Sequence, residues 1–269
     1  MVVNNKEKLF HIGISPSDGA PLALICGDPG RVCHIAALCE ELSPLASNRE
    51  YTSYSAKIDG KRIIIMSHGI GGPSTAICVE ELYMAGVRTI IRIGTCGGLQ
   101  PYTPVGTFVC SEKSIGFDGL LNFYAGRNSV CDLPMERAFL NHMGWSGNMC
   151  APAPYVIDAS TELIDRIAQN DMVRGVTIAA GGFFGPQGRE LRVPLADPHQ
   201  NEKIEKFEYN GYHITNFEME SSALAGLSRL MGHKAMTVCM VIANRLIKEA
   251  NTGYKNTIDT LIKTVLDRI

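Results

Sequence analysis

Apolar residues follow two alternating patterns along the chain. Residues 22–26, 89–93 and 235–243 are predominantly apolar runs of strand length, typical of strands buried on both faces. Between 258 and 269, apolar residues recur every three or four positions, which predicts an amphipathic helix. Because the two patterns alternate from one end to the other, they predict an α/β fold in which helices flank a mixed central sheet.

Turn-forming residues place further elements. Residues 51–58 and 62–67 have the character of strands, and the Asp59-Gly60 pair between them is a strong signal for a β-hairpin. Pro73 suits the first turn of a helix that ends at Gly86. The other predicted elements are helices at about 31–41, 160–169 and 223–231, the last stopped by Gly232, and strands at 106–111, 176–180 and 213–217.

Three local expectations concern packing. The helix after Pro73 should carry one apolar stripe made of Cys78, Val79, Leu82 and Tyr83. Residues 119–154 contain Pro, Gly, Asn and the only Trp, and we expect them to form a long surface excursion. No repeat or linker is visible, so we expect a single domain over residues 1–269.

Composition excludes several classes of protein. The chain has 269 residues, a net charge of −2 and 45% hydrophobic residues, which argues against a disordered chain and against a nucleic-acid-binding surface. The apolar runs are too short for a membrane span, and the polar N-terminus lacks a signal-peptide core. Nine cysteines without a CxxC pair, and no HExxH motif, favour reduced thiols over disulfides or a zinc site. We therefore expect a cytoplasmic protein with no nucleic-acid or membrane partner.

Glycine-rich and charged clusters follow two of the predicted strands. Ligands of α/β sheets bind beyond the carboxyl ends of strands. At 27–31 the sequence is Gly-Asp-Pro-Gly-Arg, in which glycine permits close approach of the backbone and Arg31 offers a fork for an oxyanion. Arg92 ends an apolar strand just before Thr95. Its charge needs an anion, either a ligand or a buried acidic side chain.

Three more clusters carry chemistry. Residues 69–74 begin like a dinucleotide fingerprint, but Ser74 replaces the third glycine, so a tight turn explains the glycines better than a Rossmann cofactor site. Phe183, Gln187 and Arg189 suit a planar heterocycle with carbonyl groups, although a glycine-rich surface loop is the ordinary alternative. Glu218 and Glu220 are suited to sugar hydroxyls or acid–base work, or simply to the first turn of a helix.

The five clusters together, in this order, resemble the nucleoside phosphorylase-I family, and within it the members that act on uridine. The similarity runs from about His11 to Arg245. The matching motifs are GDPGR, RIGT followed by GG, the F-x-x-x-Q-x-R segment and FEMES, and Q-x-R is the element specific for uracil. The resemblance implies a distorted, barrel-like mixed sheet and phosphorolysis of uridine to uracil and ribose 1-phosphate, with inorganic phosphate as co-substrate and no organic cofactor.

The resemblance also implies roles for individual residues. Inorganic phosphate would be bound by Gly27, Arg31, Arg92 and Thr95, with Arg49 contributed by a neighbouring subunit. The ribose would be held by Thr95, Met219 and Glu220, with His11 contributed by the neighbour.

The resemblance also implies which residues bind the base and which take part in catalysis. The base would be held by Phe183, Gln187, Arg189 and Arg245. The catalytic set would be Arg92, Gln187, Arg189 and Glu220, of which Gln187 and Arg189 stabilise the charge that develops on departing uracil. Glu50, Ile70 and Ser74 match a monovalent-cation site at the dimer interface of some bacterial members. The assembly is expected to be a homodimer at least, with a hexamer of three dimers left open.

Alternatives come from the same family and from outside it. Purine-specific members and nucleosidases carry an Asp after the last core strand, whereas this chain reads Ile-Ala-Asn-Arg at 242–245. Nucleosidases also lack the full set of phosphate arginines, which is present here as Arg31, Arg49 and Arg92. A non-catalytic nucleoside-binding protein and a Rossmann oxidoreductase are the remaining alternatives.

Overall fold

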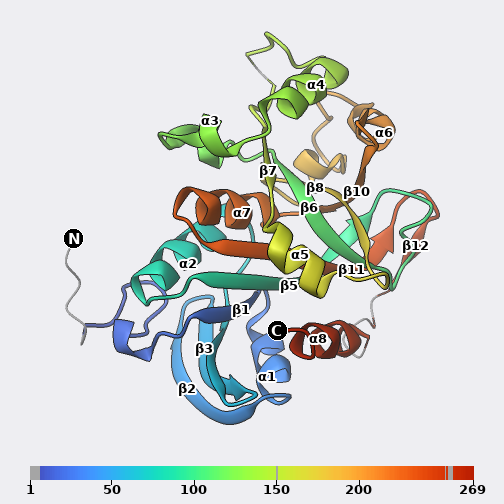
Figure 1. The fold of residues 1–269 in the computed structure, drawn as a ribbon. Coiled ribbons are helices and arrows are strands. Elements are labelled where there is room, and N and C mark those ends of the chain that lie inside the picture. The colour runs from blue at the N-terminus through green and yellow to red at the C-terminus, as the bar shows by residue number, and fades with distance from the viewer. Residues whose placement is uncertain (1–6, 150, 252, 254–256) are drawn as a thin grey trace.

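Five strands of the central sheet close into a ring in the computed structural model, which describes residues 7–149, 151–251, 253 and 257–269 (Figure 1). The ring runs through β5 (Thr89–Gly98), β11 (Lys234–Asn244), β6 (Phe108–Gly116), β8 (Val173–Ala179) and β10 (Tyr212–Glu218), and β10 returns to β5. The pairs β5–β11, β6–β8 and β8–β10 are parallel, and β6–β11 and β5–β10 are antiparallel. The expected barrel-like mixed sheet is confirmed.

A four-strand extension continues the sheet from β5. β1 (Leu22–Cys26) is parallel to both β5 and β4 (Lys61–Ser67), followed by β3 (Tyr51–Ile58) and β2 (Glu40–Asn48). The predicted hairpin is β3–β4. Asp59 and Gly60 at its tip have φ of 49° and 73°, the left-handed pair that a two-residue turn of this kind requires.

Helices cover the sheet in three groups with separate apolar cores. The helices are α1 (Pro29–Ala36), α2 (Gly72–Met84), α3 (Arg127–Val130), α4 (Leu133–Met143), α5 (Thr161–Ile167), α6 (Gln200–Lys206), α7 (Ser221–Leu230) and α8 (Ile258–Leu266). Short 3₁₀ turns lie at Pro16–Asp18, Leu120–Phe123 and Gly185–Gln187, and short strands β7 (Tyr155–Asp158), β9 (Glu208–Tyr209) and β12 (Glu249–Ala250) pair with β6, β10 and β11. Residues of α1, α5 and α8 share one core, those of α2 and α7 a second, and those of α4 and α6 a third.

Local sequence explains where several helices begin and end. The carboxylate of Asp28 accepts a hydrogen bond from Gly30 N at 2.8 Å and so caps α1, whose first residue is a proline. Gly232, with φ of 75°, follows the end of α7 as predicted. The amphipathic C-terminal helix is α8, which buries Ile258, Leu261, Ile262 and Val265.

The helix predicted at about 31–41 is shorter than expected. α1 ends at Ala36, and the chain enters β2 at Glu40. β2 is an edge strand with exposed or half-buried side chains throughout, so it has no alternating apolar pattern that the sequence could show. Hydrogen bonding to β3, rather than burial, therefore decides its conformation.

Two packing expectations were wrong. Residues 119–154 are not a surface excursion, because α4 buries Met135, Phe139 and Met143, and Trp145 packs edge-on against Phe139. Met135, Phe139 and Met143 are four residues apart, as on one face of a helix, and this spacing was visible in the sequence. On α2, Cys78, Val79 and Leu82 are buried, but the Tyr83 side chain is exposed at the end of the stripe. Its ring stacks on His233 and contacts the Arg88 guanidinium.

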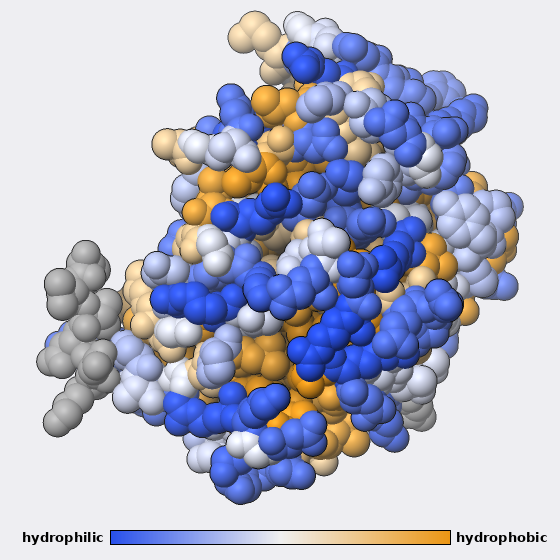
Figure 2. All heavy atoms as spheres, in the orientation of Figure 1, coloured by the Kyte–Doolittle hydropathy of each residue, from blue (hydrophilic) through white to orange (hydrophobic). Residues whose placement is uncertain are grey.

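Figure 2 shows one face of the molecule, on which hydrophilic and hydrophobic residues are interspersed. Within the described residues, no helix combines the length and apolar character that crossing a bilayer requires.

Candidate active site

A cavity of about 780 Å³ lies where β1, β5, β10 and β11 end. It brings together most of the predicted site residues, namely Gly27, Arg31, Glu50, Ile70, Ser74, Arg92, Thr95, Phe183, Gln187, Arg189, Met219 and Glu220. Three predicted residues do not line it: His11, Arg49 and Arg245. The carboxyl ends of the strands therefore gather the motifs at one place, as the α/β pattern predicts.

Two of the residues that line the cavity, Arg31 and Arg92, are buried arginines. Arg31, on the first turn of α1, is buried and donates from Nη1 to the carbonyl of Ile93 at 3.2 Å. Gly27 leaves the turn before α1 without a side chain, and a Cβ there would lie 2.9 Å from the carbonyl oxygen of Gly69. The backbone of this corner is thus packed closely enough to require glycine.

Arg92 is held by acidic side chains. Its Nη1 lies 3.0 Å from Glu218 Oε2, its Nη2 contacts Glu220 Oε2, and all three side chains are buried. Although burial disfavours the charged guanidinium, the carboxylates of Glu220 and Glu218 raise the pKa of Arg92 above its ordinary value. The buried ion pair expected as one alternative for Arg92 is therefore present, and the same guanidinium lines the cavity.

His68 completes the surroundings of Arg92. Its Nε2 accepts from Arg92 Nε at 3.2 Å, and its Nδ1 lies 3.2 Å from Thr75 Oγ1, which donates onward to the carbonyl of Gly71. Burial, together with the charges of Arg92 and Arg31, lowers the pKa of His68 well below its ordinary value. The imidazole is therefore neutral, with its proton on Nδ1, and acts as an acceptor for Arg92.

Glu220 and Met219 follow the end of β10. Besides contacting Arg92, Glu220 accepts from Gly71 N through Oε1 at 2.6 Å. A carboxylate has about four acceptor sites, so both oxygens of Glu220 can accept further hydrogen bonds from a ligand. Glu218 fixes this turn, because its carboxylate accepts from Glu220 N and from Ser221 N and Oγ at 2.7–3.1 Å.

Phe183, Gln187 and Arg189 form a second group in the cavity wall, suited to a planar ligand. Arg189 stacks its guanidinium 3.8 Å from the centre of the Phe183 ring and donates from Nη1 to Gln187 Oε1 at 2.6 Å. Burial, and then the charge of Arg245, lowers the pKa of Arg189 to about 10, which leaves it charged at neutral pH. Arg245 lies behind this group, where it donates to the carbonyl of Gln187 and lies over the Phe217 ring.

His11 and Arg49 lie together outside the cavity. Nδ1 of His11 lies 2.6 Å from Oε1 of Glu81, whose carboxylate also accepts from His11 N and Ile12 N. Asn48 Nδ2 donates to the carbonyl of His11 at 2.8 Å. The next residue, Arg49, has φ of 53° at the tip of the β2–β3 turn and is exposed.

Glu50 and Ser74 are neighbours at the edge of the cavity. Ser74 Oγ donates to Glu50 Oε1 at 2.7 Å, and Ile70 lines the same cavity. Hydrogen bonds from its own backbone N–H and from Ser74 lower the pKa of the Glu50 carboxyl. In the described part of the chain no three His, Cys, Asp or Glu side chains are grouped to hold a metal ion.

Three contributions to the positioning of the site were not predicted from the sequence. They are those of His68 and Glu81, and the role of Glu218 as an anchor for Arg92. Glu218 stood inside a recognised cluster, but its partner Arg92 is remote in the chain. His68 precedes the glycine turn at 69–72, and Glu81 lies on α2. Neither had a sequence signal, because each acts through a contact that only the fold brings about.

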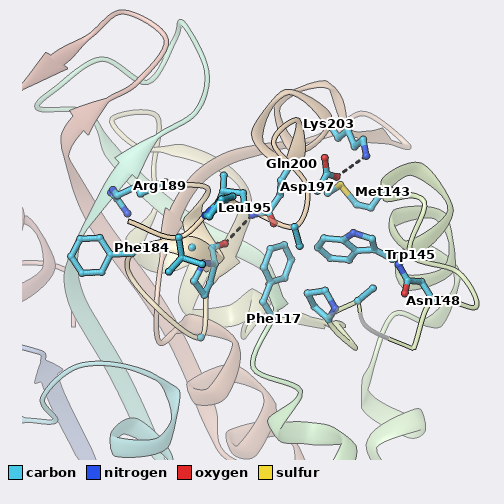
Figure 3. Close-up of a pocket in the computed structure, with 18 of the residues that line it drawn as sticks. Phe117, Met143, Trp145, Asn148, Phe184, Arg189, Leu195, Asp197, Gln200 and Lys203 are labelled. Atoms are coloured by element: carbon cyan, nitrogen blue, oxygen red, sulfur yellow. Dashed lines mark hydrogen bonds and ion pairs between the residues drawn. The ribbon is translucent and has the colours of Figure 1, made fainter. Parts of the chain in front are cut away.

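A second cavity, of about 860 Å³, is lined in part by the loop that carries Arg189 (Figure 3). Apolar side chains such as Phe117, Trp145 and Leu195 form much of its lining, and Lys203 pairs with Asp197 at 2.6 Å on its rim. Arg189 lines both cavities. Among the described residues that line the second cavity, there is no grouping of buried charged side chains like the one around Arg92.

Comparisons with known proteins agree with this geometry. Residues 21–266 match the model of the Phosphorylase superfamily. The chain is 34% identical to a uridine phosphorylase of Salmonella typhimurium, over 98% of this chain and 97% of the relative, and 33% identical to a guanosine phosphorylase of Halorubrum lacusprofundi, over 87% and 83%.

A solved structure supports the fold. The chain superposes with a TM-score of 0.84 on a Trypanosoma brucei nucleoside phosphorylase described as showing uridine phosphorylase activity, covering 99% of this chain and 98% of that one at 21% identity. A structural likeness at identity this low shows only the fold. The match to the family model, in contrast, covers nearly the whole chain. The chain therefore belongs to the phosphorylase superfamily.

Proposed function

We propose that the chain is a uridine phosphorylase, a pentosyltransferase that uses inorganic phosphate to convert uridine reversibly into uracil and ribose 1-phosphate. The observation that carries this proposal is one cavity lined both by the buried arginines Arg31 and Arg92 and by the Phe183, Gln187 and Arg189 group. The full-length uridine phosphorylase relatives support the same activity.

Phosphate is the nucleophile in this proposal. Arg31 and Arg92, with Gly27 and Thr95, hold it against the anomeric carbon. A phosphate oxygen forms the new C1–O bond as the electrons of the N-glycosidic bond leave with uracil. Fixing phosphate and nucleoside in one cavity supplies the orientation that the displacement needs, so no covalent enzyme intermediate is required.

The ribose lies between the phosphate and the base. Glu220 accepts hydrogen bonds from its 2′ and 3′ hydroxyls, and Met219 and Thr95 pack beside it. Since Glu220 also contacts Arg92, the same carboxylate links the sugar to the phosphate-binding arginine.

The base is bound as a leaving group. Phe183 packs on the pyrimidine ring, and Gln187 and Arg189 bond its O2, N3 and O4 edge, with Arg245 behind them. Negative charge accumulates on uracil as the glycosidic bond breaks, and a guanidinium already held near that edge stabilises it in the transition state.

Two subunits complete each site in this proposal. Neither His11 nor Arg49 lines its own cavity, and Asn48, the chain neighbour of Arg49, donates to the carbonyl of His11. In this proposal the two residues act on the 5′ hydroxyl and the phosphate of the partner's site. The assembly is a homodimer or a hexamer of three dimers.

A monovalent cation fits beside the site. Glu50 and Ser74 place a carboxylate and a hydroxyl oxygen together, with Ile70 nearby, and oxygen donors suit a hard cation. A dimer would bring together the Glu50, Ile70 and Ser74 residues of its two subunits. The bound cation would stabilise the interface between them.

The proposal also includes a single domain and a cytoplasmic location. Residues 1–269 form one domain, because the cavity draws on strands from β1 to β11. The enzyme is cytoplasmic, in keeping with the free thiols of the described cysteines. Cys150 lies outside the described residues.

Purine phosphorolysis is the competing activity, favoured by the guanosine phosphorylase relative. Asn244 occupies the neighbourhood where purine-specific members carry Asp, and its amide is committed to the carbonyls of Gln100 and Thr103 at 2.9 and 2.8 Å. Rates with uridine, inosine and guanosine at saturating phosphate test the choice. Uridine should exceed either purine nucleoside by at least about 100-fold, and a preference for guanosine or inosine would overturn it.

A further inference from the structure

The loop that carries the base-binding group has few apolar contacts of its own. It runs from Gly181 to Asp197, between β8 and α6. Within the described stretch 183–196, Gln187 is the one buried residue, with 4% of its surface exposed. Burial of apolar side chains therefore does little to fix this loop, and its conformation depends on its own turn and on polar contacts with the rest of the molecule.

The turn inside this loop places Arg189 beside Gln187. The backbone N–H groups of Gln187 and Arg189 both donate to the carbonyl of Phe184, at 3.0 Å each. Between them, Gly188 has φ of 65°, a left-handed conformation that favours glycine. The directions in which the Gln187 and Arg189 side chains leave the loop therefore depend on the backbone at Gln187 and Gly188.

Asn201 contacts this backbone from outside the loop. It lies in the first turn of α6, and its Nδ2 donates to the carbonyl of Gln187 at 3.3 Å. The amide also packs against Gly188, because a Cβ on that glycine would lie 2.5 Å from both Nδ2 and Oδ1 of Asn201. Asn201 Oδ1 has no hydrogen-bond partner among the described residues, so the amide bonds to the loop and not to its own helix.

α6 is anchored in the interior of the protein. Its Ile204 is buried in the apolar core that also contains Phe139. Next to Asn201, Nε2 of Gln200 donates to the carbonyl of Pro186 at 3.0 Å (Figure 3). Two successive residues of α6 thus bond to two successive carbonyls of the loop, and the helix connects the exposed loop to the core.

We propose that Asn201 is a positioning residue that sets how Gln187 and Arg189 meet the pyrimidine. It acts through the carbonyl of Gln187 and the turn at Gly188, because Asn201 itself does not line the reaction cavity. This inference rests on the proposed function and extends it to a residue outside the cavity wall. Loss of the contact should weaken base binding and leave phosphate binding unchanged, since other elements hold the phosphate-binding arginines.

Asn201→Asp tests this role, because at neutral pH the carboxylate keeps the shape of the amide but cannot donate to a carbonyl. Initial rates are measured with uridine varied at saturating phosphate, and with phosphate varied at saturating uridine. We expect kcat/KM for uridine to fall about tenfold and the KM for phosphate to stay within about twofold of wild type. The affinity for uracil, measured by isothermal titration calorimetry, should also fall about tenfold. Glu202→Gln, at the exposed next position of α6, is the matched control and should behave as wild type.

A double-mutant cycle distinguishes positioning from a general disturbance of the fold. Gln187→Ala already lacks the side chain through which Asn201 acts, so adding Asn201→Asp to it should lower kcat/KM by less than about threefold. Asn201→Ala, which removes the donor without adding a charge, should show the same separation between uridine and phosphate. Circular dichroism and melting temperatures verify that each variant is folded.

The possible results separate this inference from the proposed function. An active wild type with unchanged uridine kinetics in both Asn201 variants would overturn the inference alone. So would an equal loss of affinity for phosphate, or a tenfold effect that persists in Gln187→Ala. A wild-type protein that neither binds nor cleaves uridine would overturn the proposed function, and the inference with it.

Discussion

Nη1 of Arg92 lies 3.0 Å from Oε2 of Glu218, in surroundings where both side chains are buried. The pair joins the end of β10 to the middle of β5, and Glu218 also accepts from Ser221 and from the backbone of Glu220. A charged group buried without its counter-charge is costly, so this contact fixes the site before any substrate binds.

Glu218→Gln should therefore reduce both stability and activity. The amide keeps the shape but removes one counter-charge of Arg92, and the free energy of unfolding should fall by about 1–3 kcal/mol. Because Arg92 and Glu220 lose a shared anchor, kcat/KM for uridine should fall about tenfold. Urea unfolding and initial rates measure the two effects. Glu208→Gln, on exposed β9, is the control, and a Glu218→Gln protein as stable as that control would contradict the assigned role.

Arg189→Ala should abolish most of the uridine activity without unfolding the protein. Among the described residues, the contacts of the guanidinium are with Phe183 and Gln187 of its own loop, so its loss should shift the melting temperature little. Losing the charge opposite departing uracil should lower kcat/KM by at least about 100-fold. Arg192→Ala removes an exposed arginine of the same loop and should stay within about twofold of wild type. Near-normal turnover in Arg189→Ala would refute the base-binding assignment.

His68 should make the protein less stable in mild acid. The folded state lowers the pKa of His68 below the ordinary 6.5, so the unfolded chain binds the proton more tightly. The contribution of neutral His68 is complete above pH 6.5 and is lost as the pH falls below it, with a slope of up to about 1.4 kcal/mol per pH unit. Unfolding free energies between pH 5 and 8 should therefore show a shallower slope for His68→Gln than for wild type. His199→Gln, which replaces an exposed ring, is the control, and parallel curves for His68→Gln and wild type would disprove the buried neutral state.

Subunit sharing can be tested by complementation. Arg49→Ala and Arg189→Ala proteins should each be nearly inactive, but refolding them together forms mixed dimers in which one site has both arginines intact. An equal mixture should recover about a quarter of wild-type activity. Arg92→Ala mixed with Arg189→Ala should recover none, because both residues belong to the same side of the site. Failure of the first mixture to exceed its components would show that Arg49 acts within its own subunit.

The sequence predicted the elements that have a strong apolar signal. The buried strands, the Asp59-Gly60 hairpin and the C-terminal helix carry period, length or turn chemistry that local physics dictates. β2 was missed because an exposed edge strand has no such pattern. The helix around Phe139 was missed although its spacing of four was present, since Pro, Gly and Asn on either side suggested a loop.

The candidate site was predicted in its parts but not in its connections. Motif order identified Arg92, Glu220 and Arg189 as residues that meet at one place. The sequence could not show that Arg92 is held by Glu218 and by neutral His68, because those contacts join segments far apart in the chain. Nor could it show that Glu81 binds His11, which does not line its own cavity.

A phosphorylase and a nucleosidase differ in whether they need phosphate, so dependence on phosphate decides between them. Purified protein is incubated with uridine in buffer with and without inorganic phosphate, uracil is followed by absorbance after separation, and ribose 1-phosphate by ³¹P NMR. The account predicts no uracil release without phosphate, and with phosphate one ribose 1-phosphate formed for each uracil. Uracil release that proceeds without phosphate and yields free ribose would contradict it.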